Sequence, residues 1–178
     1  MVTFGARMRN AARHIGIAAA AATLLAAGGA AAQLDPRAPI DITADSSEFI
    51  QSRCASTWTG AVEALQGRTR LRAERVVLFT VKKGEECGAS DRMEADGQVY
   101  FVTPERTIRA DSAVYNFPSE TITLTGNVII VQGKSVVRGD RVVINTRTGQ
   151  AEMSSSVKGR NKPGRVRGVF YPNQGSVR

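Results

Sequence analysis

Four acidic residues recur at matching places along the chain: Asp45, Glu74, Asp111 and Asp140. Neighbouring carboxylates can perform general acid–base catalysis or hold a cation. Catalysis needs one differentiated site, whereas these acids are equivalent members of a repeat. We therefore expect a structural role, in which each acid marks a bend and pairs with a neighbouring arginine, as charges do in stacked strands. The arginines at matching places are Arg72, Arg109 and Arg138.

The single histidine, His14, lies in a stretch typical of a secretory signal. Basic residues come first, an apolar run follows over residues 15–27, and Ala30-Ala31-Ala32 offers a cleavage site before Gln33. The alternative is an uncleaved membrane anchor, which needs about 20 apolar residues. Cleavage would remove the histidine and lower the formal net charge from +8 to +5. Without histidine, the mature chain has neither Ser-His-Asp nor Cys-His catalysis, nor histidine metal sites.

Two cysteines remain in the mature chain, Cys54 and Cys87. An oxidising compartment favours one disulfide between them, and two buried free thiols are the alternative. Cys87 lies in an eight-residue insertion, whose first part, residues 82–86, we interpret as a solvated loop. A bridge would therefore tie the inserted loop to an adjacent turn.

The acids belong to a repeated β unit. Gly60 and Val62 precede Glu74 at the spacing that Gly126 and Val128 keep before Asp140, and a third copy begins at Gly97. Between the turn signals, apolar residues alternate with polar ones over about ten residues, which is typical of strands with one buried face. Glycines in the middle of strands mark bends. We predict an all-β protein whose bent strands stack into a folded-over sheet with two walls and an apolar crease between them.

Apolar residues at the same place in successive copies predict the lining of this crease. A packed core is the simplest explanation of such columns, and an open trough for acyl chains is the alternative. The candidate lipid-binding residues are Leu71, Val99, Phe101, Ile108, Tyr115, Leu124, Val128, Ile130, Val137 and Ile144. A folded-over sheet that does not close has an edge strand at each end, and exposed edges invite another strand. The predicted edge residues are Ile40, Ile42, Val166, Val169 and Phe170.

Other classes of function fit less well. A glycan-binding or purely structural solenoid stays open, although few aromatic residues are present to form sugar platforms. A sequence pI near 10.2 and the basic stretch 157–167 suggest nucleic acid, but an exported chain does not meet that partner. No phosphate-cradling loop of the Rossmann or Walker type occurs. Since cleavage also removes the only histidine, we expect no cofactor, no bound metal and no enzymatic activity.

Several motifs resemble the OstA-like family over about residues 40–172. They are Ile-Arg-Ala-Asp-Ser-Ala-Val-Tyr (108–115), Thr-Leu-Thr-Gly-Asn-Val (123–128), Val-Arg-Gly-Asp-Arg-Val-Val-Ile-Asn-Thr-Arg-Thr-Gly (137–149) and Arg-Val-Arg-Gly-Val-Phe-Tyr-Pro (165–172). The resemblance implies an open, twisted β-jellyroll in the periplasm whose interior shields the acyl chains of lipopolysaccharide. It also implies edge-to-edge contacts with an inner-membrane transport complex, an outer-membrane translocon and further copies of the chain.

The predicted organisation is a signal peptide over 1–32, an N-terminal arm over 33–39, the OstA-like domain over 40–172 and a tail over 173–178. We interpret the mature chain as a lipopolysaccharide carrier that bridges the two membranes. A same-fold periplasmic component of the inner-membrane partner, or a detached translocon domain, is the alternative within the family.

Overall fold

The computed structural model describes residues 38–171, which are almost entirely β-structure. The predicted signal peptide and the predicted tail lie outside the described residues. The short 3₁₀ turn η1 (Gln51–Arg53) is the one helical element in this range. Among residues 38–171, no helix has the length and apolar character needed to cross a membrane.

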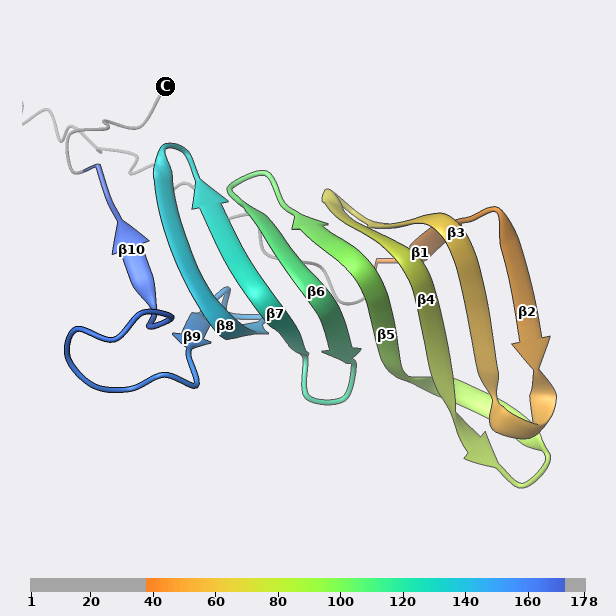
Figure 1. Cartoon of the computed structure of the whole chain (residues 1–178). Helices are drawn as coiled ribbons and strands as arrows, with labels where there is room; N and C mark the ends of the chain where they lie inside the picture. Colours follow the sequence, from red (N-terminus) through yellow and green to blue (C-terminus); the bar gives the residue numbers. More distant parts are fainter. Residues whose placement is uncertain (1–37, 172–178) are drawn as a thin grey trace, which may run out of the picture.

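Ten strands form one antiparallel sheet (Figure 1). They are β1 (Ile40–Thr43), β2 (Ser46–Ile50), β3 (Ala55–Gln66), β4 (Thr69–Lys83), β5 (Glu86–Val102), β6 (Thr107–Asn116), β7 (Thr121–Gln132), β8 (Ser135–Asn145), β9 (Ala151–Ser154) and β10 (Arg167–Val169). The order across the sheet is β1-β3-β4-β5-β6-β7-β8-β10, with β2 also paired to β3 and β9 also paired to β8.

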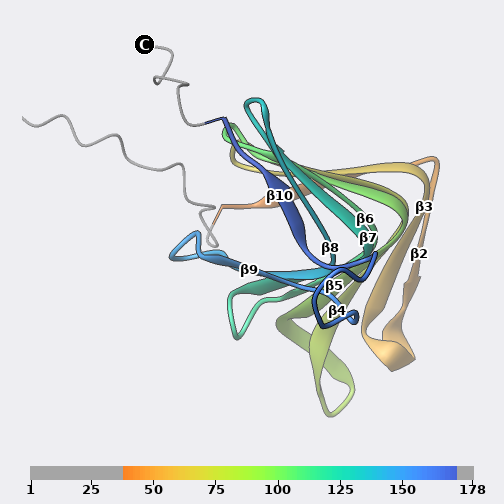
Figure 2. The same cartoon turned by 60° about the vertical axis from the view of Figure 1, so that its left-hand side comes forward.

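Each edge of the sheet is therefore made of two short strands. β1 and β2 pair with the two halves of β3, and β10 and β9 pair with the two halves of β8. The two edges are not paired with each other, so the sheet stays open. Figure 2 shows the sheet folded along its bends, with two walls that diverge from them. The prediction of an all-β, open, folded-over sheet is confirmed.

The bends lie where glycine permits a left-handed backbone. Gly60, Gly97 and Gly126 have φ between +80° and +85°, and the residue after each is also left-handed. The strand register shifts at these places, for example between Thr59 and Val62 against β4. Such bulges bend a strand and increase its twist. Because β3, β5 and β7 all carry this bulge at the same level, the whole sheet folds along one line.

The cross-strand register joins the apolar residues into continuous rows. On the first wall, which contains β1 and β10, one row reads Ile42, Ala64, Leu71, Phe101, Ile108, Ile130 and Val137. On the second wall, which contains β2 and β9, one row reads Trp58, Val76, Ala95, Ala113, Leu124, Val142 and Met153. Ile108 and Leu124 are fully buried where the walls meet, so stacking buries a strip that one hairpin cannot bury alone.

The repeated acids mark the bends as predicted, but their predicted arginine partners are wrong. Arg72 lies opposite Glu63 in the ladder and its Nε bonds that carboxylate at 2.8 Å. Within residues 38–171, no salt bridge joins the four acids to Arg72, Arg109 or Arg138. The predicted pairs do not form because the acids point toward other groups. Asp111, for example, reaches across to the next strand, where Asn127 Nδ2 donates to its Oδ2 at 2.8 Å.

The inserted residues form a hairpin: residues 82–86 are solvent-exposed as predicted, but only Gly84 and Glu85 form the turn, and the others are paired strand residues. β4 and β5 continue outward as a hairpin, with Lys82 opposite Cys87 and Lys83 opposite Glu86. Gly84, at φ +63°, supplies the left-handed residue that a tight two-residue turn needs. The predicted disulfide between Cys54 and Cys87 is present and ties this hairpin to the turn between β2 and β3.

Candidate apolar binding crease

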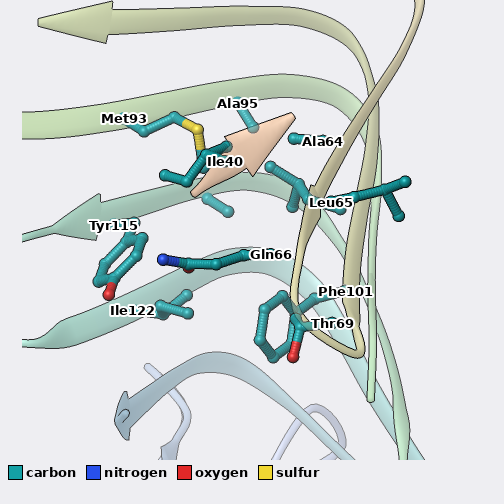
Figure 3. A pocket seen from close by; sticks show the side chains of 12 residues that line it. Ile40, Ala64, Leu65, Gln66, Thr69, Met93, Ala95, Phe101, Tyr115 and Ile122 are labelled. Carbon is teal, nitrogen blue, oxygen red and sulfur yellow. The ribbon is translucent and has the colours of Figure 1, made fainter. Parts of the chain in front are cut away.

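A narrow pocket lies between the two walls (Figure 3). It measures about 440 Å³ counted out to its open mouth. Its lining consists of Ile40, Ala64, Leu65, Gln66, Thr69, Leu71, Met93, Ala95, Phe101, Ala113, Tyr115 and Ile122. None of these side chains carries a charge at neutral pH, so the pocket offers apolar contact rather than ionic recognition.

Each wall supplies one side of this pocket. Leu71 and Phe101 are opposite each other in the first wall. Met93, Tyr115 and Ile122 are opposite one another across β5, β6 and β7 in the second wall. Side chains of one face point the same way in adjacent strands, so the sheet register alone brings these residues to the pocket.

Two polar contacts lie at the rim. Gln66 Nε2 donates to the carbonyl oxygen of Ala38 at 3.0 Å. Arg106 Nη2, in the turn between β5 and β6, donates to the carbonyl oxygen of Gly149 at 3.2 Å. Gly149 lies in the turn between β8 and β9, so this hydrogen bond joins the end of the first wall to the end of the second. The two walls are therefore linked directly at that place.

The Tyr115 hydroxyl is a buried polar group beside the pocket. It has no hydrogen-bond partner among the described residues, and the nearby hydroxyl of Thr146 donates instead to the Glu120 carbonyl at 3.0 Å. Burial raises the pKa of the Tyr115 phenol, so it stays neutral at physiological pH. Its ring packs against Phe117 with centroids 4.3 Å apart. Tyr115 therefore contributes mainly apolar contact to the pocket, and its hydroxyl makes no hydrogen bond among the described residues.

The chemistry available here is hydrophobic burial. In the part of the chain that the structure describes, no group of three or more His, Cys, Asp or Glu residues could hold a metal ion. The apolar rows and the absence of charge in the lining suit a saturated chain or another apolar occupant.

The predicted crease residues divide into three groups. Leu71, Phe101 and Tyr115 line the pocket. Val99, Ile108, Leu124, Val128 and Ile144 are closed within the core, with at most 4% of their surface exposed. Ile130 and Val137 are half-buried toward β10. Met93 and Ile122 line the pocket without having been predicted to do so. Both fall in the same cross-strand row as Tyr115, so the alignment of β5 and β7 with β6 is the signal that identifies them.

The predicted edge residues lie at opposite ends of the sheet. Ile40 and Ile42 in β1 are half-buried against the core. Val166, Val169 and Phe170, in and beside β10, expose 43%, 44% and 69% of their surface. The predicted residues at the C-terminal edge are therefore more exposed than those in β1.

Comparison with known proteins gives related chains in several bacteria. Protein R00383 of Rhizobium meliloti (strain 1021), which is uncharacterised, is 27% identical over 128 residues, 69% of each chain. The LPS-assembly protein LptD of Saccharophagus degradans is 32% identical over 68 residues, which are 38% of this chain and 8% of that protein. The matched segment is thus a small part of that LptD.

A solved structure has the same fold. The crystal structure of LptH, the LptA-homologous periplasmic component of the lipopolysaccharide transport device of Pseudomonas aeruginosa, matches with a TM-score of 0.65 at 19% identity. The match covers 78% of this chain and 99% of that one. The family described as LptA/(LptD N-terminal domain) LPS transport protein matches residues 41–150 and, in a second overlapping match, residues 107–166. The chain therefore belongs to the LptA/LptD N-terminal domain family of lipopolysaccharide transport proteins, as its resemblance to the OstA-like family predicts.

Proposed function

We propose that the mature chain is a periplasmic, non-enzymatic carrier that shields the acyl chains of lipopolysaccharide in its crease. The observation that carries the proposal is an uncharged pocket, open between the two walls of an unclosed sheet, in a member of this family. Burial of each CH₂ group of an acyl chain contributes about 0.8 kcal/mol. Several chains are then held firmly without covalent chemistry.

Binding of acyl chains requires the walls to move apart. The pocket is narrow, and Ile108, Leu124 and Val128 have no exposed surface in this closed form. The walls are continuous only through the bends, so their separation breaks side-chain contacts and the Arg106–Gly149 hydrogen bond rather than the ladders. An acyl chain would replace the contacts that the two apolar faces lose.

Transfer between partners would use the two edges. The β1/β2 edge carries the acids Asp41, Asp45 and Glu48, and no basic residue lies between positions 38 and 50. The opposite edge follows the stretch 157–167, which has basic residues and no acid. Opposite charges and unpaired backbone groups favour head-to-tail strand addition. The family resemblance orients the chain, with the N-terminal edge toward the inner-membrane complex and the C-terminal edge toward the outer-membrane translocon.

Photo-crosslinking in cells tests the carrier proposal. A photoreactive phenylalanine analogue at Phe101 should crosslink to lipopolysaccharide, because Phe101 lines the pocket. The matched control places the same analogue at Tyr100, the preceding residue of β5, whose side chain faces the opposite side of the sheet. Crosslinks of equal yield from both positions, or none from Phe101 in a correctly folded protein, would contradict the proposal.

A further inference from the structure

The outer face of the first wall carries a row of arginines near β10. Across the ladder, Arg109 lies opposite Ile129, Ile129 opposite Arg138, and Arg138 opposite Arg167. All three arginines are exposed. Like charges directly opposite each other destabilise a sheet. An anion bound near Arg138 and Arg167 would therefore relieve their repulsion and stabilise this pairing of β8 with β10.

These arginines lack the partner that their counterpart has. Arg72, at the matching place in β4, bonds Glu63 on the neighbouring strand. Within residues 38–171, neither Arg138 nor Arg167 lies within 4.0 Å of a carboxylate oxygen. The acid beside them, Asp140, is already engaged, because Ser155 and Ser156 donate to its Oδ2. The positive charge of this face is thus not neutralised by the chain itself.

Two surface hollows adjoin at Arg138 and Arg167. The hollows measure about 650 Å³ and 720 Å³ counted to their open sides, and both are bordered by Arg138 and Arg167. Lys134 joins the first hollow and Arg165 joins the second. We call these four residues the outer cationic cluster.

Exposed apolar side chains surround this cluster. Val136, Val169 and Tyr171 line the first hollow, and Tyr171 exposes 52% of its surface. Phe170, between the last two in sequence, lies on the other face of β10, with its ring beside Gly168. Basic residues mixed with exposed aromatic rings are typical of surfaces that lie at the phosphate level of a lipid bilayer, where cations meet phosphates and rings reach the acyl boundary.

We propose that the outer cationic cluster binds the phosphate groups of anionic lipids at a bilayer surface. The inference is independent of what the crease holds. A second copy added to β10 would meet the edge of the sheet, whereas Arg138 lies one strand inside that edge and Lys134 lies in the turn between β7 and β8. A flat surface with many anions reaches all four cations together, which one neighbouring strand does not.

Vesicle flotation of the mature full-length chain tests this proposal. The chain should float with vesicles that contain phosphatidylglycerol and not with pure phosphatidylcholine vesicles, and binding should fall as salt rises. Arg138→Ser/Arg167→Ser should weaken the apparent partition at least about tenfold. Arg138→Lys/Arg167→Lys, which keeps the charge, should retain most of it.

The matched control is Lys82→Ser/Lys83→Ser. These lysines lie in the hairpin of β4 and β5, far from β10 (Figure 1), and their replacement removes the same charge. Equal losses in this control would show that net charge alone attracts the vesicles and would overturn the proposal. Equal flotation with phosphatidylcholine would overturn it too. Release of the protein by millimolar inorganic phosphate at constant ionic strength would also overturn the proposal, since a single free phosphate would then occupy the cluster. An arginine variant that changed self-association but not flotation would overturn it as well.

Discussion

The carboxylate of Asp111 occupies the space where a side chain on Gly126 would stand. A Cβ built on Gly126 would collide with Asp111 Oδ2, and the same relationship joins Gly60 to Asp45. A Cβ built on Gly97 would likewise lie only 2.7 Å from the Cβ of Glu74. Each bend is thus a joint between a left-handed glycine and the acid of the preceding repeat, which explains why both recur together.

Replacement of Gly126 by alanine should destabilise the fold markedly. A side chain at φ +82° is strained, and its Cβ must also displace Asp111. We expect the free energy of unfolding in urea to fall by about 2–5 kcal/mol. Gly149→Ala is the matched control, because Gly149 has φ +71° and open space around it, so it should lose only about 1–2 kcal/mol. Equal losses of unfolding free energy at both positions would show that the contact with Asp111 does not contribute to the effect.

Loss of the disulfide should destabilise the oxidised protein. Cys54 and Cys87 are 33 positions apart, so their bridge restricts a long loop of the unfolded chain. We expect Cys54→Ala/Cys87→Ala to lower the free energy of unfolding by about 2–4 kcal/mol. Reductant should lower the stability of the natural chain by a similar amount and leave the double variant unchanged. A natural chain whose urea midpoint does not respond to reductant would contradict the expectation.

The hydroxyl of Tyr115 should be dispensable for folding, unlike its ring. Because the hydroxyl has no partner among the described residues, Tyr115→Phe should change the free energy of unfolding by less than about 1 kcal/mol. Tyr115→Ala should cost about 3–5 kcal/mol, since it removes a buried ring. Urea unfolding of the two variants decides the point. If Tyr115→Phe costs as much as Tyr115→Ala, the hydroxyl has a stabilising partner.

Asp140 should anchor the segment after β9 in a pH-dependent way. The Ser156 N–H and the hydroxyls of Ser156 and Ser155 hold the pKa of Asp140 below its ordinary value. A lowered carboxyl pKa gives stability that is present above the unfolded-state pKa and is lost as pH falls through the folded-state value. The Ser156 amide resonance should therefore titrate with a midpoint below that of an aspartate in an unfolded peptide of the same sequence. Asp140→Asn should remove this titration, and a midpoint that is not lower than in the peptide would contradict the assignment.

Proline in β10 should separate lipid binding from assembly. Successive N–H groups of a strand point to opposite sides, so of Gly168→Pro and Val169→Pro one removes the outward donor. That variant should keep the Phe101 crosslink and lose self-association in sedimentation velocity. Val169→Ala, which keeps the N–H, is the control and should assemble normally. Unchanged assembly in both proline variants would exclude strand addition at this edge.

The repeat made most of the fold predictable. Glycines at a constant distance before an acid placed the bends, and period-two alternation placed the inward faces. The alternation could not show which inward side chains line the pocket and which are closed within the core. Val128 and Tyr115 look alike as inward residues, yet only Tyr115 reaches the pocket, because Val128 lies beside the bend where the walls touch.

Two expectations failed for physical reasons that the sequence does not display. Arg72 and Glu74 are near in sequence, but the ladder places Glu63 opposite Arg72 and turns Glu74 toward Gly97. Residues 82–86 are polar, as solvated loops are, yet partner residues on the returning strand and one glycine suffice to make them a hairpin. Both outcomes depend on which residues face each other across strands.

The rows across the first wall repeat nearly the same surroundings from one strand to the next, about every 4.8 Å. For a flexible apolar tail held against such a row, a step along it replaces one apolar neighbour with another, such as Ile108 with Ile130 or Ile130 with Val137. The free energy along this direction is therefore nearly level, with low barriers. Such a surface opposes dissociation of a bound apolar tail into water but hardly opposes its movement from strand to strand. A small difference in free energy between the two ends is then enough to set the direction of movement.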